Sequence, residues 1–233
     1  MSITENIKHI RAEMEAAAIA AGRDPKTILL CAATKMNDAP AIREAIAAGV
    51  DCCGENRVQE LTAKIAQNAY DGVPVHFIGH LQTNKVKQVV GKVALIHSVD
   101  SLRLLQAISR EATHQGICQD ILLEINIGGE ESKSGFTPEA LWEALDIASS
   151  LPSIFVRGLM AIPPICENPG DNDKFFQKMY QLSVDITTKK YDNVCSTILS
   201  MGMSADYPAA ITYGSTMVRI GTDIFGARNY TAK

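Results

Sequence analysis

The feature that most constrains the fold is an alternation of short apolar runs with helix-like segments, repeated eight times along the chain. The runs are mostly continuous rather than alternating, which is typical of parallel strands covered by helices. The expected strands span residues 27–35, 51–55, 76–80, 95–99, 120–127, 155–162, 197–201 and 217–225. Eight such units in 233 residues predict a single (β/α)8 TIM barrel domain, residues 1–233.

The segments between the runs carry helix signals. Asp100 is expected to cap one helix, and Thr137-Pro138 to open another. An extra helix precedes the first strand, because residues 2–5 form a capping box and an apolar stripe follows. The stripe consists of Ile3, Ile7, Ile10 and Met14. Too few residues follow the eighth strand for a helix there, so we expect the N-terminal helix to cover that gap in the ring.

An open, doubly wound sheet is the competing fold. It predicts a glycine-rich phosphate loop directly after the first strand. The residues at that place, 32–37, read Ala-Ala-Thr-Lys-Met-Asn and contain no glycine. The sequence therefore favours the barrel.

Charge and hydropathy exclude several classes of function. The net charge is −4, so the chain as a whole does not attract nucleic acid or anionic membranes electrostatically. No apolar run approaches the length of a membrane span, and charged residues occupy the N-terminus where a signal peptide would be apolar. We expect a cytoplasmic protein.

The six cysteines form no CxxC pair. They are expected to be small buried residues in a reducing compartment. Zinc ligands would have to cluster, and these cysteines are dispersed along the sequence, so we expect no metal site. They are Cys31, Cys52, Cys53, Cys118, Cys166 and Cys195.

Lys35 ends the first expected strand, and the active sites of such barrels lie at the C-terminal ends of the strands. A lysine there either extends its amine to water or has a lowered pKa that favours imine formation. Far along the sequence, Arg219 and the pair Gly221-Thr222 fall in the eighth strand. A strand-end lysine combined with these residues suits pyridoxal phosphate. Arg219 then faces the ring nitrogen; alternatively, it pairs with Glu124 or Glu55.

The phosphate site of this fold is commonly built after strands seven and eight. Small and hydroxyl residues there let backbone N–H groups approach a phosphate. The candidates are Ser200, Gly202, Ser204, Gly221 and Thr222.

Three further residues complete the candidate cofactor site. Asn56 either caps a helix or touches the ligand. His80, which ends the third strand, is either a packed neutral histidine or a ligand contact. Met201 lies between the two candidate serines, although the methionines of this region are expected mainly to pack.

Several segments resemble the pyridoxal-phosphate homeostasis protein family, which is related to the barrel domain of bacterial alanine racemase. They are residues 33–35, 54–56, 76–85, 98–101, 158–163, 199–204 and 214–226. The resemblance implies an imine between Lys35 and pyridoxal 5′-phosphate, and contact of Arg219 with the pyridine nitrogen. It also implies that Ser200, Ser204, Gly221 and Thr222 hold the phosphate beside Asn56. Thr34 stands where many relatives have serine.

The resemblance implies a cofactor-binding protein without efficient catalysis, so no catalytic residue is assigned. The expected partners are pyridoxal phosphate and apo-enzymes that accept it, and the expected state is a monomer. An amino-acid racemase is the alternative. It needs a second proton-transfer group besides Lys35, which racemases bring from a second domain; Tyr207 and Tyr213 are the tyrosines nearest in sequence. A Schiff-base aldolase is a third reading, but it leaves Arg219 unexplained.

Overall fold

The computed structural model describes residues 2–164, 168 and 170–226, and its strands close into one parallel barrel in sequence order. The strands are β1 (Leu29–Ala33), β2 (Cys52–Glu55), β3 (Val75–Phe77), β4 (Leu95–Val99), β5 (Gln119–Ile125), β6 (Ile154–Ala161), β7 (Val194–Ser200) and β8 (Met217–Ile220). Pairing of Cys31 with Arg219 and of Ala32 with Ile220 joins β1 to β8. The predicted eight-stranded TIM barrel is confirmed.

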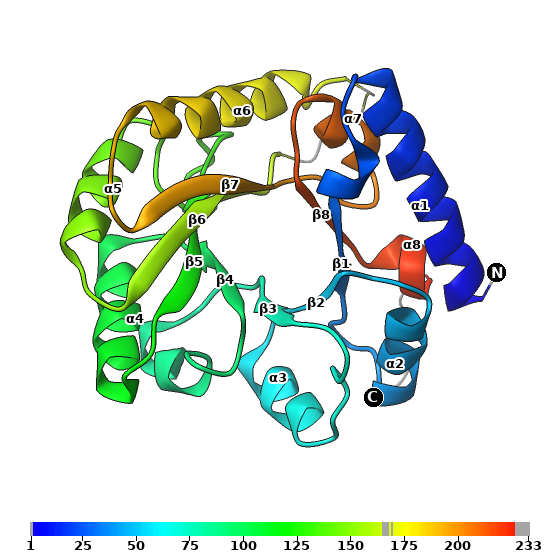
Figure 1. Ribbon diagram of the computed structural model, residues 1–233, viewed down its shortest axis with the longest axis horizontal. Coiled ribbons are helices and arrows are strands. Elements are labelled where there is room, and N and C mark those ends of the chain that lie inside the picture. Colours follow the sequence, from blue (N-terminus) through cyan, green and yellow to red (C-terminus); the bar gives the residue numbers. More distant parts are fainter. Residues whose placement is uncertain (1, 165–167, 169, 227–233) are drawn as a thin grey trace.

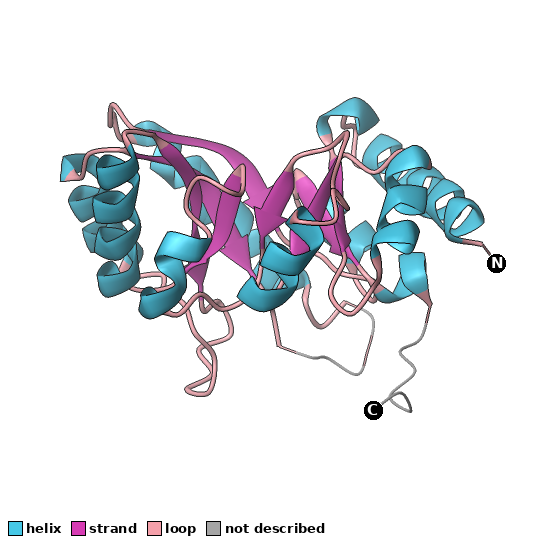
Figure 2. Cartoon of the chain, turned by 90° about the horizontal axis from the view of Figure 1, so that it is seen from below, coloured by secondary structure: helices cyan, strands magenta, loops and turns pink. Residues whose placement is uncertain are grey.

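Helices surround the strands, as Figures 1 and 2 show. They are α1 (Ile3–Ala20), α2 (Ala39–Ala47), α3 (Val58–Ile65), α4 (Leu102–Gln115), α5 (Leu141–Ser150), α6 (Asp173–Thr188), α7 (Tyr207–Thr212) and α8 (Thr222–Phe225), with the 3-10 helices η1 (Pro25–Thr27) and η2 (Thr83–Gln88). Most of the apolar core lies between this ring and the strands.

The N-terminal helix α1 has the predicted capping box, formed by Ser2 and Glu5, and buries Ile7, Ile10 and Met14. It packs beside α7 and α8 (Figure 1). Asn6 donates a hydrogen bond to the carbonyl oxygen of Ile224 in α8, at 2.9 Å. The expected covering of the ring by α1 is therefore confirmed.

Two local predictions were wrong. The chain leaves β8 at Gly221 and turns into the short helix α8, so a helix does follow the last strand. Helix α4 is capped by Ser101, whose hydroxyl accepts from the backbone N–H of Leu104, because the carboxylate of Asp100 is engaged by His80 instead.

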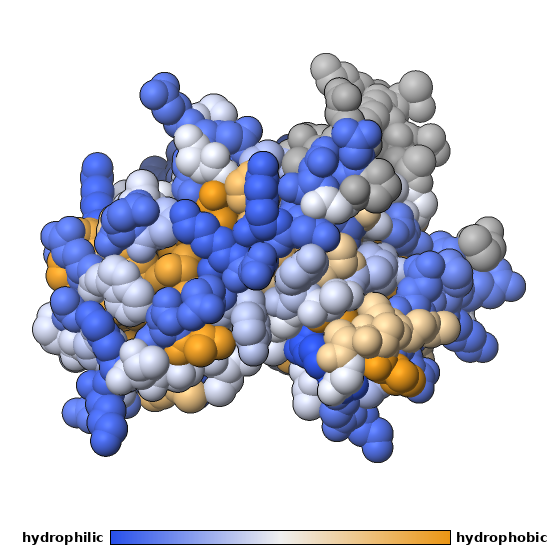
Figure 3. Space-filling view, turned by 90° about the horizontal axis from the view of Figure 1, so that it is seen from above, coloured by the Kyte–Doolittle hydropathy of each residue, from blue (hydrophilic) through white to orange (hydrophobic). Residues whose placement is uncertain are grey.

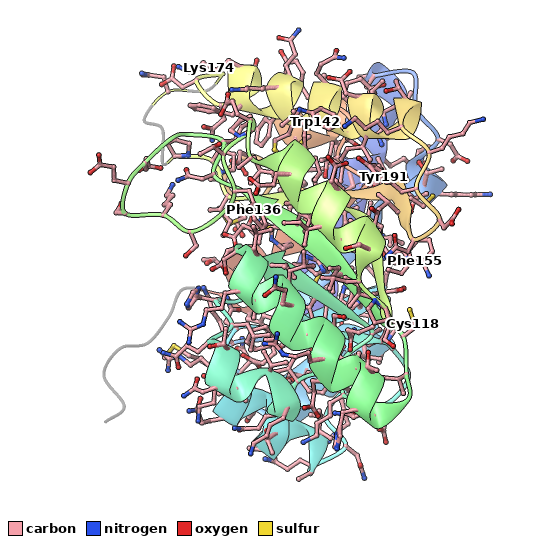
Figure 4. All side chains as sticks on the ribbon, turned by 90° about the vertical axis from the view of Figure 1, so that its left-hand side faces the viewer. Cys118, Phe136, Trp142, Phe155, Lys174 and Tyr191 are labelled. Atoms are coloured by element: carbon pink, nitrogen blue, oxygen red, sulfur yellow. The ribbon has the colours of Figure 1, made fainter. Side chains whose placement is uncertain are left out.

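The two ends of the barrel are distinguishable in Figure 4. Cys118 and Phe155, at the starts of β5 and β6, lie toward one side, and Phe136, in the loop after β5, lies toward the other.

Cys118 and Cys195 are exposed, which contradicts the expectation that the cysteines are buried; Cys31, Cys52 and Cys53 are buried as expected. Cys166 lies outside the described residues.

Hydrophilic side chains cover most of the face shown in Figure 3, with hydrophobic residues in small areas between them. Within the described residues, no helix combines the length and apolar character needed to cross a bilayer.

Candidate functional site

The turns that follow β1 and β8 meet at the C-terminal end of the barrel. A Cβ atom placed on Gly221 would lie 3.4 Å from the Cβ of Ala33, two residues before Lys35. Lys35 itself is half-buried. The lysine and the glycine turn, far apart in the sequence, are therefore close in space.

The backbone directly after Lys35 has an unusual conformation. Met36 has a φ of 62°, in the left-handed region that residues other than glycine rarely adopt. The side chain of Glu60 accepts a hydrogen bond from the backbone N–H of Met36 at 2.8 Å, which holds this turn in place. Such strained positions cluster at functional sites.

A buried ionic network, which the sequence does not reveal, lies behind Lys35. Lys64 Nζ contacts the Glu55 carboxylate at 2.6 Å and donates to the carbonyl oxygen of Thr34 at 2.9 Å. The hydroxyls of Thr34 and Tyr70 also donate to Glu55. Burial and the Glu55 charge raise the pKa of Tyr70, so its phenol remains a donor. The network fixes the end of β1 against β2 and α3.

Asn56 follows Glu55 and reaches the barrel mouth. Its backbone N–H donates to the Glu55 carboxylate at 2.7 Å, and a Cβ on Gly79 would lie only 2.1 Å from the Asn56 carbonyl oxygen. The close approach of the β3 turn thus fixes Asn56. The side-chain Oδ1 of Asn56 is buried and has no hydrogen-bond partner within the part of the chain that the structure describes, which is unusual for a folded chain and suits a residue that contacts a ligand.

Arg219 on β8 is buried inside the barrel. Its guanidinium donates to the carbonyl oxygen of Ser200 at 2.8 Å, to the Ser200 hydroxyl at 2.6 Å and to the carbonyl oxygen of Ala161 at 2.9 Å. Among the described residues it makes no ion pair, and Glu55 is taken by Lys64. Neutral oxygens rather than a carboxylate thus fix Arg219.

Ser200 links Arg219 to two histidines below it. Its hydroxyl lies 3.1 Å from Nδ1 of His97, and His97 Nε2 lies 3.1 Å from Nδ1 of His76. Burial lowers the pKa of His76 to about 4, and burial, with His76 and the Arg219 guanidinium close by, lowers the pKa of His97 well below its usual value. Both imidazoles are therefore neutral, and the Ser200 side chain serves to orient Arg219.

The turn after β7 lies against the start of α8. The hydroxyl of Ser204 accepts a hydrogen bond from the backbone N–H of Asp223 at 3.4 Å. The carbonyl oxygen of Gly202 accepts one from the backbone N–H of Arg219 at 3.0 Å. Ser204 and Gly221 are half-buried and Thr222 is exposed. The structure thus brings these three predicted phosphate residues together at the surface of the mouth. The Met201 side chain is fully buried in the outer core and packs there.

His80 is exposed rather than packed in the core. Its side chain is 60% exposed, and its Nδ1 lies 3.1 Å from the Asp100 carboxylate. With Asn56 it lines a cavity of about 250 Å³ at the barrel mouth. The other lining residues are Ile78, Gly79, Ser98, Glu124, Ile125, Asn126, Lys133, Ser134 and Ile162.

Glu124 on β5 is a titratable group of this cavity whose behaviour the sequence did not reveal. Burial and the nearby Asp100 raise its pKa to about 7, although Arg219 and His80 act in the opposite direction. A carboxyl whose pKa is higher in the folded chain stabilises the fold at low pH, and that contribution is lost as pH rises through about 7.

We therefore expect Glu124→Gln to gain stability over the natural chain between about pH 5 and about pH 8, by on the order of 2 kcal/mol. Urea unfolding at several pH values measures this difference. Glu143→Gln, at an exposed position of α5, is the control and should leave the pH profile unchanged. Parallel profiles for Glu124→Gln and the natural chain would show that Glu124 is ionised throughout this range.

The fold and this polar mouth place the chain in the class of alanine-racemase-type barrels. The family model described as alanine racemase, N-terminal domain, matches residues 2–229. Relatives named pyridoxal phosphate homeostasis protein cover almost the whole chain. The one from Aquifex aeolicus is 43% identical over 230 residues, which is 99% of this chain and 100% of the relative. The one from Escherichia coli K12 is 39% identical, covering 99% of each chain. The chain belongs to the pyridoxal phosphate homeostasis protein family.

Solved structures of similar proteins have the same fold as this chain. PipY of Synechococcus elongatus, determined with pyridoxal phosphate bound, has a TM-score of 0.83 and 32% identity, covering 97% of this chain and 100% of PipY. A Clostridium difficile alanine racemase has a TM-score of 0.70 at 16% identity, and the match spans 58% of that enzyme. The racemase therefore shares the fold of this chain.

Proposed function

We propose that this chain binds pyridoxal 5′-phosphate as an imine on Lys35 and acts in cytoplasmic homeostasis of the cofactor, without efficient catalysis. The observation that carries the proposal is the meeting of Lys35, the Ser204 turn and the Gly221 turn above the buried Arg219. The bound cofactor of PipY, at 32% identity over nearly the full chain, supports it.

The residues fit the parts of this cofactor. A primary amine at Lys35 can condense with its aldehyde. Ser204, Gly221 and Thr222 offer hydroxyl and backbone donors to the phosphate. Arg219 can only donate a hydrogen bond, so it suits an unprotonated ring nitrogen. Asn56 Oδ1 has no hydrogen-bond partner among the described residues and would lie beside the ring.

We propose smaller roles for three other candidate residues, Ser200, His80 and Met201, on the basis of their contacts. Ser200 would act mainly through Arg219, which its hydroxyl holds at 2.6 Å. His80 would contact a ligand from the exposed side of the mouth. Met201 would contribute through packing behind the phosphate turn.

A racemase is the alternative, and the contacts of two tyrosines argue against it. Racemisation needs a proton-transfer group on each face of the substrate α-carbon. The Tyr207 hydroxyl bonds to Glu13 of α1, and the Tyr213 hydroxyl bonds to Asp173 at 3.0 Å, so neither is available at Lys35. Glu124 is the observation that favours a racemase, because a carboxyl group with a pKa of about 7 suits proton transfer.

The deciding experiment incubates the cofactor-loaded chain with a panel of L-amino acids and follows D-isomers by chiral chromatography. We expect no turnover at ordinary enzymatic rates, since loss of one proton-transfer group alone costs roughly 10²–10⁴ in rate. A parallel assay mixes the loaded chain with an apo-enzyme and should show transfer of the cofactor. Turnover that disappears in both Lys35→Ala and Glu124→Gln would instead establish the racemase.

The phosphate assignment predicts a large effect at Gly221. Its φ of −120° is accessible to any residue, so Gly221→Leu should fold, but the leucine side chain would fill the space beside Ala33. We expect cofactor affinity to fall at least about tenfold, a loss of about 1.4 kcal/mol. Absorbance titration measures the affinity, and thermal unfolding checks the fold. The cofactor affinity of Gly221→Ala, whose Cβ would lie 3.4 Å from the Cβ of Ala33, should fall between the affinities of the natural chain and of Gly221→Leu. Unchanged affinity in Gly221→Leu would move the phosphate elsewhere.

We also propose that the chain acts as a monomer. Among the described residues, the large apolar side chains that are exposed come from several different elements; they are Ile19, Leu29, Met36, Ile162, Tyr180 and Val184. Light scattering coupled to size-exclusion chromatography gives the mass directly.

A further inference from the structure

A second cluster of reactive side chains lies inside the barrel, below the cofactor site. Cys31, Cys52 and His76 come from β1, β2 and β3, which follow one another around the barrel (Figure 1). One ligand atom of each residue lies within 4.8 Å of the other two. All three residues are buried. The expectation that no such ligands cluster rested on their spacing in the sequence, which the barrel overrides.

The strand pairing explains why these residues meet. Cys31 and Cys52 are directly paired in the β1–β2 register, so their side chains project from neighbouring positions into the barrel. They pack in an interior cluster with Met217 and Ile78, separate from the main core. Cys53, the next residue along β2, belongs to the outer core instead, as the alternation of a strand requires.

We propose that Cys31, Cys52 and His76 form a buried site for a thiolate-preferring d10 cation, of which Zn²⁺ is the form to test. Two thiolates and one imidazole are ligands that zinc selects, with bonds of about 2.3 Å to sulfur and about 2.0 Å to nitrogen. Ligand atoms around one such ion lie roughly 3.5–4 Å apart by these bond lengths, which the cluster accommodates. The ion replaces two thiol protons, so the occupied site has no net charge, as a buried position favours.

Two further features support the site. The imidazole of His76 is held by His97 at 3.1 Å, and metal-binding histidines are typically held by such a second contact through the other ring nitrogen. A cavity of about 210 Å³ at the N-terminal end of the barrel reaches His76 past Leu29, Asp120 and Met217. It provides an entry route separate from the mouth that Lys35 occupies, so the proposal does not rest on the cofactor function.

The test titrates the reduced, cofactor-free full chain with Co²⁺, followed by displacement with Zn²⁺. We expect one ion per chain, thiolate-to-cobalt charge-transfer bands, and intense visible bands typical of tetrahedral coordination, with a water molecule as the fourth ligand. Cys52→Ser and His76→Gln should lose these bands. Cys118→Ser and Cys195→Ser are the controls, because these exposed thiols lie outside the cluster and should leave binding unchanged.

Zn²⁺ should also raise the melting temperature of the natural chain and of both controls, but not that of Cys31→Ala, which serves if the other variants fold poorly. Three outcomes would overturn the proposal. They are absence of stoichiometric binding, cobalt spectra without thiolate bands, and binding that disappears in Cys118→Ser or Cys195→Ser.

Discussion

Lys35→Ala is expected to abolish covalent attachment of pyridoxal phosphate while leaving the barrel folded. Lys35 lies beyond the last residue of β1, and its side chain is half-buried rather than part of the core. Removing its amine leaves nothing at this position to condense with the aldehyde, whereas the turns at Ser204 and Gly221 that we propose for the phosphate stay intact. The variant should therefore retain weak, non-covalent binding and lose the yellow colour of the imine.

Borohydride reduction followed by digestion and mass spectrometry locates the adduct in the natural chain. Lys87→Ala, which changes an exposed lysine of η2, is the control and should be labelled fully at Lys35. A stable adduct on a different lysine, such as Lys133 in the neighbouring cavity, with Lys35 unmodified, would refute the assignment. Because the readout is chemical, it does not depend on any assumption about turnover.

The sequence predicts the barrel well because each strand is a local signal. Continuous apolar runs and helix caps repeat regularly, and eight repeats leave few other arrangements. The end of β8 was harder to predict, since Ile224 and Phe225 look like a continuation of the strand but belong to α8. Ile224 is buried, so a helical turn satisfies the same apolar pattern over so short a length.

The candidate site was predictable where residues lie at strand ends. Lys35, Asn56, Ser204 and Gly221 could be assigned to the mouth because the C-terminal ends of parallel strands converge there. Side-chain partners were not predictable, since they depend on which atoms meet across the barrel. The hydrogen bonds of Arg219 to Ser200 and Ala161 illustrate this, because the sequence suggested only an acid as the alternative partner.

Lys64 shows the same limitation most clearly. In the sequence it is one lysine of an amphipathic helix, a position that is normally exposed. In the fold its side chain is 9% exposed and its ammonium lies 2.6 Å from the fully buried carboxylate of Glu55. It also contacts Glu60, which holds the turn at Met36. A residue that sequence reasoning would leave on the surface thus connects β1, β2 and α3 behind the candidate site.

Lys64→Met should therefore strongly destabilise the fold. Methionine fills the space of the lysine stem but leaves the Glu55 charge buried without its cation. Breaking a buried pair in this way costs about 3–5 kcal/mol. Lys87→Met, at an exposed position, should cost less than about 0.5 kcal/mol. Urea unfolding of the cofactor-free chain measures both.

A double variant separates the ion pair from simple packing. In Glu55→Gln with Lys64→Met, no charge remains buried at this place, so a substantial part of the lost stability should return. If the pair instead acted only by packing, the double variant would be at least as unstable as the two single variants combined. The network also holds the Thr34 carbonyl oxygen, one residue before Lys35. Lys64→Met should therefore lower the yield of the Lys35 adduct even where the chain remains folded, and Lys87→Met should not.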